Sequence, residues 1–130
     1  MLLVDTSVWV EIFRRPARLT LADVADLDEI VTCLPIVQEV LQGFRDERAY
    51  RVASEAFMSF AVVDSPLPAD RFVDAANLDR SARRAGFTVR SSTDCLIAAS
   101  ALRHQLPIVH RARDYAMLAR VSPLRESQIR

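Results

Sequence analysis

Two aspartates follow short apolar runs that are typical of buried strands. Asp5 comes directly after Leu2–Val4, and Asp114 comes a few residues after Pro107–Val109. In a parallel α/β sheet, ligands bind beyond the carboxyl ends of the strands. Both side chains are therefore expected at the edge of the sheet where a ligand would bind.

Two further acids could reach the same edge from helices. Asp94 lies at a predicted helix start, and Glu39 lies one turn inside the helix that follows the second apolar run. Four carboxylates in one crevice would repel each other, and divalent cations relieve such repulsion. Because oxygen ligands alone suit Mg²⁺ or Mn²⁺ better than zinc, the pattern indicates a site for one of these ions.

Each of these acids also has a purely structural interpretation. Asp5 could cap the helix that follows it, and Asp94 could form a capping arrangement with Ser91. Glu39 falls at the border of the polar face of its helix, where a carboxylate is usually solvated. Asp64 also follows an apolar run, so the strand-end rule cannot separate it from Asp5. Spacing alone therefore leaves more candidates than one site needs.

The elements that must position these side chains can be predicted from the apolar pattern. Short apolar runs alternate with longer helical patterns, which favours an α/β domain over residues 1–130. Its mostly parallel central sheet would have about four to five strands flanked by helices. The predicted strands are Leu2–Val4, Ile30–Cys33, Ala61–Val63 and Pro107–Val109. The predicted helices include one that begins near Thr6, and others over about Pro35–Phe44, about Asp46–Phe60, Ala69–Ala85 and from Ser91 through the apolar run Cys95–Leu102.

Composition excludes several classes of protein. The chain has 130 residues, of which 51% are hydrophobic and 26% charged, values typical of a globular domain. All 17 basic residues are arginine, and without lysine there is no Walker A nucleotidase, pyridoxal phosphate enzyme or kinase. Gly43 and Gly86 alone cannot build a glycine-rich phosphate loop. A formal net charge of zero excludes a uniformly basic nucleic-acid-binding protein.

Cysteine and histidine usage indicates the cellular environment of the protein and bears on whether it binds zinc. Cys33 and Cys95 are too few for a disulfide framework and indicate a reducing, cytoplasmic environment. The apolar N-terminus is interrupted by acids and lacks a basic region, which predicts neither a signal peptide nor a membrane span. His104 and His110 have no matching cysteine pair, so a zinc site is not expected, and His110 is expected to form hydrogen bonds at a strand end.

The first predicted helix is apolar around most of its circumference, with Glu11 as its one charge before Arg14. A helix that covers one face of a sheet needs only one apolar stripe. Apolar side chains around most of the helix therefore predict that the helix is buried on several sides, either inside the domain or against a partner chain.

Four segments resemble, in order along the chain, the acidic motifs of PIN-domain nucleases. They are Leu2–Trp9 around Asp5, Pro35–Val40 around Glu39, Asp94–Ala99, and Ile108–Tyr115, where Asp114 precedes an aromatic residue. Each motif is weak alone, whereas four in this order across nearly the whole chain look like a VapC-type toxin of a toxin–antitoxin pair.

This resemblance implies a metal-dependent endoribonuclease that acts as the toxin of such a pair. Asp5 and Asp94 would be the main ligands of Mg²⁺ or Mn²⁺. Glu39 would position metal-bound water, and Asp114 would hold a second cation directly or through water. These four acids are the implied catalytic residues.

The same resemblance implies roles for the residues around these acids. Ser7 and Ser92 are expected to orient the carboxylates through hydrogen bonds. Arg111 and Arg113 flank the last motif and would contact phosphates of the RNA substrate.

The resemblance further implies protein partners. A cognate antitoxin peptide or protein would lie in an apolar groove and block the site. Trp9 and Phe13, which are four residues apart and share a helix face, are the expected anchors. A homodimer is expected, and binding to a membrane is not.

One position departs from the family pattern. VapC-type toxins often carry another aspartate two residues before the last one, and this chain has Ala112 there. The departure puts the second metal site in doubt and makes a catalytically degraded PIN-like interaction module the alternative. A haloacid-dehalogenase-like phosphatase is disfavoured, because Ser7 stands where its second aspartate would be and no lysine follows.

Overall fold

The computed structural model describes all 130 residues and contains one five-stranded sheet. The strands are β1 (Leu2–Val4), β2 (Ile30–Cys33), β3 (Ala61–Val63), β4 (Ile108–His110) and β5 (Glu126–Gln128). Their spatial order is β3-β2-β1-β4-β5, and every pairing is parallel. The predicted α/β class with a mostly parallel sheet is confirmed.

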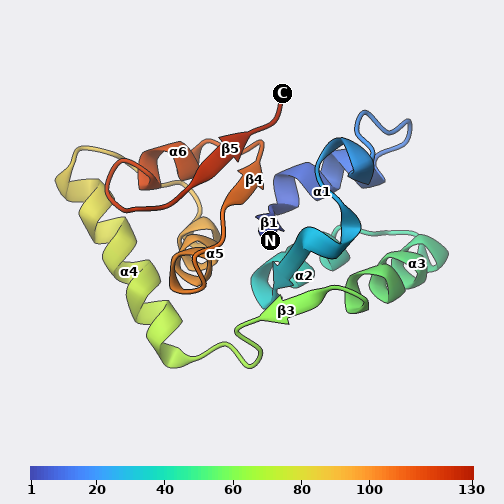
Figure 1. Cartoon of the computed structure of the whole chain (residues 1–130), viewed down its shortest axis with the longest axis horizontal. Coiled ribbons are helices and arrows are strands. Elements are labelled where there is room, and N and C mark those ends of the chain that lie inside the picture. The colour runs from blue at the N-terminus through green and yellow to red at the C-terminus, as the bar shows by residue number, and fades with distance from the viewer.

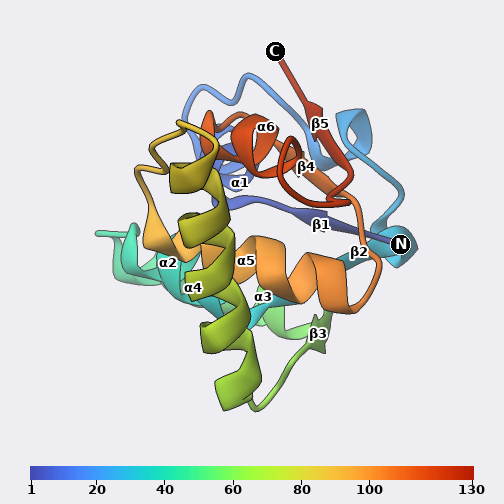
Figure 2. The ribbon, with the colours of Figure 1, turned by 90° about the vertical axis from the view of Figure 1, so that its left-hand side faces the viewer.

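Helices connect the strands and cover the sheet. They are α1 (Thr6–Phe13), α2 (Leu34–Gln42), α3 (Glu47–Met58), α4 (Ala69–Arg84), α5 (Ser92–Arg103) and α6 (Asp114–Leu118), with short 3-10 turns at Leu21–Asp23 and Leu27–Glu29. Helices α3 and α4 lie at opposite ends of the long axis, with α5 between them (Figure 1). Figure 2 shows α4 crossing in front of α5, against which it packs. None of the helices combines the length and hydrophobicity that a membrane span requires.

Capping residues explain where three of the helices begin. The Asp5 carboxylate accepts a hydrogen bond from the Ser7 N–H at the start of α1, and Asp46 caps α3 in the same way. The Ser91 hydroxyl accepts the N–H of Asp94 at 3.3 Å at the start of α5. Such caps satisfy amides that have no partner within the helix. The structural interpretation of Asp5 as a helix cap is therefore correct, and Asp94 does pair with Ser91 through its backbone.

The order of the strands brings distant segments of the chain together. The chain builds β1, β2 and β3 outwards in one direction and then returns to the other side of β1 with β4 and β5. The carboxyl ends of β1 and β4 thus lie side by side, where the Asp5 N–H donates to the Val109 carbonyl at 2.9 Å. Such a reversal of strand order is where open α/β sheets bind ligands.

Helix α1 is mostly covered by its own domain. Val8 is fully buried and Trp9 is 2% exposed, while Phe13 is partly buried against the Phe44 ring. Val10 is the one large apolar side chain of this helix that is exposed. The apolar coat predicted for the helix therefore packs largely within the chain.

Two elements were not predicted from the sequence. Strand β5 is a short polar edge strand beside β4, and α6 is a helix of five residues that starts at Asp114. Strand β4 also starts and ends one residue later than expected, so it includes His110. Helix α6 begins within the last motif, and β5 follows it along the chain.

Candidate active site

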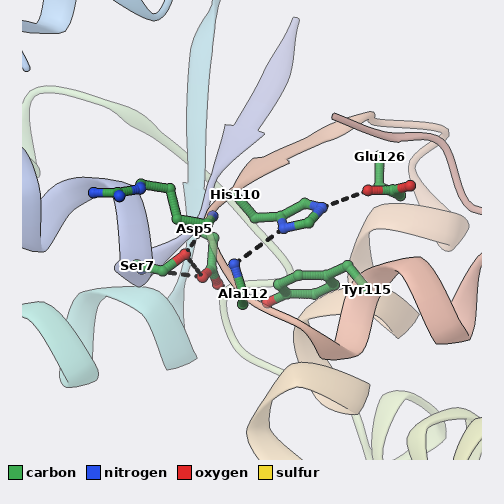
Figure 3. Close-up of polar contacts among 7 residues, drawn as sticks. Asp5, Ser7, His110, Ala112, Tyr115 and Glu126 are labelled. Atoms are coloured by element: carbon green, nitrogen blue, oxygen red, sulfur yellow. Dashed lines mark hydrogen bonds and ion pairs between the residues drawn. The ribbon is translucent and has the colours of Figure 1, made fainter. Parts of the chain in front are cut away.

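The hydroxyl of Tyr115 donates a hydrogen bond to the Asp5 carboxylate and also contacts the Asp94 carboxylate at a longer distance. The phenol oxygen lies 2.6 Å from Asp5 Oδ1 and 3.4 Å from Asp94 Oδ1. Asp5 follows β1, Asp94 lies in the first turn of α5, and Tyr115 belongs to α6. Three distant segments therefore meet at the carboxyl edge of the sheet, where the Tyr115 hydroxyl points at Asp5 (Figure 3).

Asp5 is held from two sides and is only 3% exposed. Its Oδ2 accepts hydrogen bonds from the backbone N–H of Ser7 at 3.0 Å and from the Ser7 hydroxyl at 2.6 Å. The Ser7 oxygen in turn accepts the N–H of Arg111 at 2.8 Å. Because a hydroxyl donates once and accepts twice, Ser7 joins the end of β1 to the end of β4.

Glu39 reaches the site from α2. Its Oε1 accepts a hydrogen bond from the Thr6 hydroxyl at 2.9 Å. Burial raises the pKa of Glu39, the Thr6 hydrogen bond lowers it, and the charge of Asp5 raises it further, with a net upward shift. The side chain is therefore half-buried beside Asp5, and its interpretation as a solvated surface carboxylate is wrong.

Crowding of carboxylates is clearest at Asp94. Its pKa rises from 3.8 to about 7, first because of burial and then because of the charges of Asp5, Asp114 and Glu39. Asp5, Glu39 and Asp114, the other three acids singled out by the sequence, therefore all lie within electrostatic reach of Asp94. A strongly raised carboxyl pKa in such a cluster is typical of sites that bind cations or perform acid–base chemistry.

Asp114 is tied to the segment that precedes α5. It is 3% exposed, and its carboxylate accepts the N–H of Arg90 at 3.1 and 3.2 Å and the N–H of Ser91 at 2.9 Å. Asp114 thus fixes the loop that places Asp94. Ala112 is half-buried and presents only a methyl group, so no carboxylate stands two residues before Asp114.

The donor set fits a magnesium-like ion with few protein ligands. No three acidic, histidine or cysteine side chains converge into a ready-made ligand cage. Mg²⁺ retains several waters and is commonly bound through one or two carboxylates together with substrate phosphates. Asp5 and Asp94 supply two neighbouring carboxylates, the number and type of protein ligand that such an ion needs.

Two of the expected supporting residues have other contacts. Ser92 forms no hydrogen bond with a carboxylate, and its neighbour Ser91 contacts Asp114 instead. The guanidinium of Arg111 pairs with Glu11 at 3.2 Å, while Arg113 is exposed and forms no ion pair. Arg113 therefore has no ion-pair partner within the chain, whereas Arg111 has one.

Asp64, the other strand-end acid, belongs to a different cluster. Strand β3 lies at the edge of the sheet, and Asp64 contacts His104 Nε2 at 2.9 Å and Arg71 Nε at 3.4 Å. Burial raises the pKa of Asp64, but the His104 hydrogen bond and the nearby Arg71 charge lower it overall. His104 therefore contacts Oδ1 of Asp64, while Oδ2 lies near Arg71 without a hydrogen bond, and neither contact involves the acids around Asp5.

Sequence reasoning missed two polar side chains at the site, Thr6 and the hydroxyl of Tyr115. The sequence hinted at them only by adjacency, since Thr6 directly follows Asp5 and Tyr115 directly follows Asp114. His110 forms strand-end hydrogen bonds, as expected: its Nε2 lies 2.5 Å from Glu126 Oε2, and its Nδ1 accepts the Ala112 N–H (Figure 3).

Comparisons with known proteins agree with this geometry. The model of the PIN domain family matches residues 2–121. The chain belongs to the PIN-domain family. It is 38% identical to VapC ribonuclease Mb1587 of Mycobacterium bovis and to Ribonuclease VapC11 of Mycobacterium tuberculosis, in each case over 100% of both chains. The predicted resemblance to VapC-type proteins is thus confirmed.

Solved structures share the PIN fold at lower identity. VapBC2 from Rickettsia felis, bound to a promoter DNA fragment, has a TM-score of 0.77 at 15% identity, with 98% of each chain covered. DNA-bound VapBC from Salmonella typhimurium has a TM-score of 0.76 at 17% identity, with the same coverage. At these identities the likeness concerns the fold.

Proposed function

We propose that this PIN domain is an endoribonuclease dependent on Mg²⁺ or Mn²⁺ and acts in the cytoplasm as the toxin of a toxin–antitoxin pair. The observation that carries the proposal is that the Tyr115 hydroxyl contacts both Asp5 and Asp94, where burial and then the neighbouring carboxylates raise the pKa of Asp94 to about 7. The full-length relatives named as ribonucleases support RNA as the substrate.

Each acidic residue of the site has its own proposed role in cleavage. Asp5 and Asp94 would hold the cation, which when bound stabilises negative charge on the attacked phosphate. Glu39 keeps Oε1 against Thr6, and its second oxygen is free to accept a proton from the attacking water. Asp114 would hold a second cation directly or through water, and it also fixes the loop ahead of α5, because its carboxylate accepts the N–H groups of Arg90 and Ser91.

RNA would be attracted by the arginines near the site. Arg113 is exposed and unpaired, so its guanidinium can donate two parallel hydrogen bonds to a phosphate. Arg111 can do so only if it leaves Glu11. We therefore assign the main phosphate contact to Arg113.

An antitoxin segment would lie in the groove between α1, α2 and the start of α3. The groove has a volume of about 760 Å³, and Glu39 lies on its wall, so an occupant would reach the carboxylates. Apolar side chains and arginines line it: Val10, Phe13, Val40, Phe44, Arg14, Arg15 and Arg45. These side chains suit a segment with both apolar and acidic residues. Trp9 does not line this groove and instead stacks against Phe13 at 5.8 Å, so we assign the direct contact to Phe13.

RNA cleavage by the purified chain tests the proposed activity. Wild type, Asp5→Asn and Asp94→Asn would be compared in Mg²⁺ or Mn²⁺ and after addition of a chelator. Glu55→Gln is the matched control, because Glu55 is exposed on α3 and forms no ion pair. We expect wild type and the control to cleave only with metal, and both aspartate variants to be inactive.

Equal cleavage by wild type and both aspartate variants would contradict the proposed activity. The alternative, a degraded interaction module, predicts no cleavage by any form and no thermal stabilisation by Mn²⁺. A working site should gain stability as the cation occupies it.

A further inference from the structure

We propose that Tyr115 is a positioning residue of the cation site, an inference that rests on the proposed function. Its hydroxyl would hold the carboxylates of Asp5 and Asp94 in the relative placement that lets them share one divalent ion. The phenol oxygen is the one hydrogen-bonding group that touches both side chains.

The two carboxylates depend on this hydroxyl to different degrees. Asp5 Oδ2 already has two donors from Ser7, whereas Oδ1 has Tyr115 as its side-chain donor at 2.6 Å. The Asp94 carboxylate contacts this hydroxyl at 3.4 Å and otherwise lies against the side chain of Asp114, another acid. Without the hydroxyl, electrostatic repulsion between the carboxylates of Asp5 and Asp94 would rotate the two side chains away from each other.

The surrounding side chains keep the Tyr115 ring in place. Tyr115 is fully buried, and its ring centre lies 5.0 Å from that of His110, which is itself fully buried. His110 Nδ1 accepts the N–H of Ala112, so the neutral imidazole carries its proton on Nε2 and donates it to Glu126. Figure 3 shows this chain of contacts running from Glu126 to the tyrosine.

The backbone on the other side of the ring is also fixed. Asp114, directly before Tyr115, binds the N–H groups of Arg90 and Ser91 in the loop ahead of α5. Asp114 and Tyr115, the first two residues of α6, therefore link Asp5 at the end of β1 to the loop that leads into the helix of Asp94. A donor that is held this firmly aligns its acceptors before the ligand arrives.

The Tyr115 hydroxyl brings no charge to the crowded carboxylates. A phenol is a neutral donor at physiological pH, so it can donate to Asp5 beside Asp94 without adding to the repulsion between the acids.

Substitution of the hydroxyl alone tests the inference. Tyr115→Phe removes one oxygen and leaves the ring packing. Tyr50→Phe is the matched control, because Tyr50 is 38% exposed and its hydroxyl forms no hydrogen bond within the chain. Mn²⁺ binding would be measured by calorimetry. We expect Tyr115→Phe to bind Mn²⁺ about tenfold more weakly than wild type, with Tyr50→Phe unchanged. At saturating Mn²⁺ the cleavage rate of Tyr115→Phe should return towards that of wild type.

The outcomes separate this inference from the proposed function. Equal Mn²⁺ affinity in wild type and Tyr115→Phe, even with a lower melting temperature, would give the hydroxyl a purely structural role and overturn the inference alone. A wild-type protein that binds no Mn²⁺ would overturn both.

A second measurement needs no substitution at Tyr115. With ¹³C-labelled tyrosine, wild type gives one ring Cζ resonance for each of its two tyrosines, and Tyr50→Phe assigns them. We expect Mg²⁺ to shift the Tyr115 resonance in a saturable way and to leave that of Tyr50 in place. An unshifted Tyr115 resonance in a protein that binds the ion would overturn the inference.

Discussion

Replacement of Asp94 by asparagine should stabilise the metal-free protein at alkaline pH, although it should abolish activity. Asparagine has the shape of the protonated acid and removes the charge that faces Asp5, Asp114 and Glu39. Because the folded-state pKa of about 7 lies above the unfolded value of 3.8, ionisation of Asp94 lowers the free energy of unfolding as the pH rises. The decrease starts near pH 4 and reaches its full size above pH 7.

The size of the effect follows from two opposing contributions. A pKa difference of about 3 corresponds to roughly 4 kcal/mol if the group were fully shielded from water. Asp94 is partly exposed, so solvent screening reduces this to about 2 kcal/mol. Loss of a negative charge from the first turn of α5 costs about 0.5–1 kcal/mol. We therefore expect a net gain of about 1 kcal/mol, or about 3–5 °C in melting temperature.

The assay is thermal unfolding in a chelator at about pH 8 and about pH 5.5. Asp70→Asn is the matched control, because Asp70 is an exposed acid in the first turn of α4 and loses only the helix-dipole contribution. Asp94→Asn should melt above wild type at the higher pH, and the gain should shrink at the lower pH. Addition of Mn²⁺ should reverse the order, since only wild type binds the ion. Equal destabilisation of Asp94→Asn and Asp70→Asn at both pH values would refute the reasoning.

Three further predictions concern the hydrogen bonds and protons of the site. Ser7→Ala should cost about 1–3 kcal/mol of unfolding free energy and weaken Mn²⁺ binding, because Asp5 loses a donor and the Arg111 N–H loses its acceptor; unchanged Mn²⁺ affinity in calorimetry would contradict this. Cation binding should release a proton below about pH 7, because Asp94 must ionise before it binds the ion. The heat of Mn²⁺ binding should then differ between buffers of different ionisation enthalpy, and identical heats in all buffers would contradict the prediction. His110→Leu should lose about 3 kcal/mol in urea unfolding, since a buried N–H and a carboxylate lose their partner, whereas the more exposed His104→Leu should lose about 1 kcal/mol; equal losses would argue against this.

Much of the fold could be predicted because buried strands and capped helices leave local signals. The runs Leu2–Val4, Ile30–Cys33 and Ala61–Val63 match strands β1 to β3, and Ser91 caps the helix that was expected to start there. Strand β5 was missed because Glu126–Gln128 is polar, lies at the edge and has no apolar alternation. Its pairing with β4 is set by tertiary contacts that no local pattern encodes.

The four acids of the site could be chosen only with the family resemblance. The strand-end rule treats Asp5 and Asp64 alike, and the difference between them is the order of the strands, which places β1 at the centre and β3 at the edge. The contacts of Tyr115 and the pairing of Arg111 with Glu11 depend on side chains far apart along the chain. Such contacts could not be predicted before the fold was known.

Titration of the purified chain with Mn²⁺ most directly tests whether the carboxylates at this edge bind a cation together. Wild type and Glu55→Gln should bind Mn²⁺ equally, while Asp5→Asn and Asp94→Asn should each lose at least about tenfold in affinity. Wild-type affinity in both aspartate variants would contradict the joint role of Asp5 and Asp94.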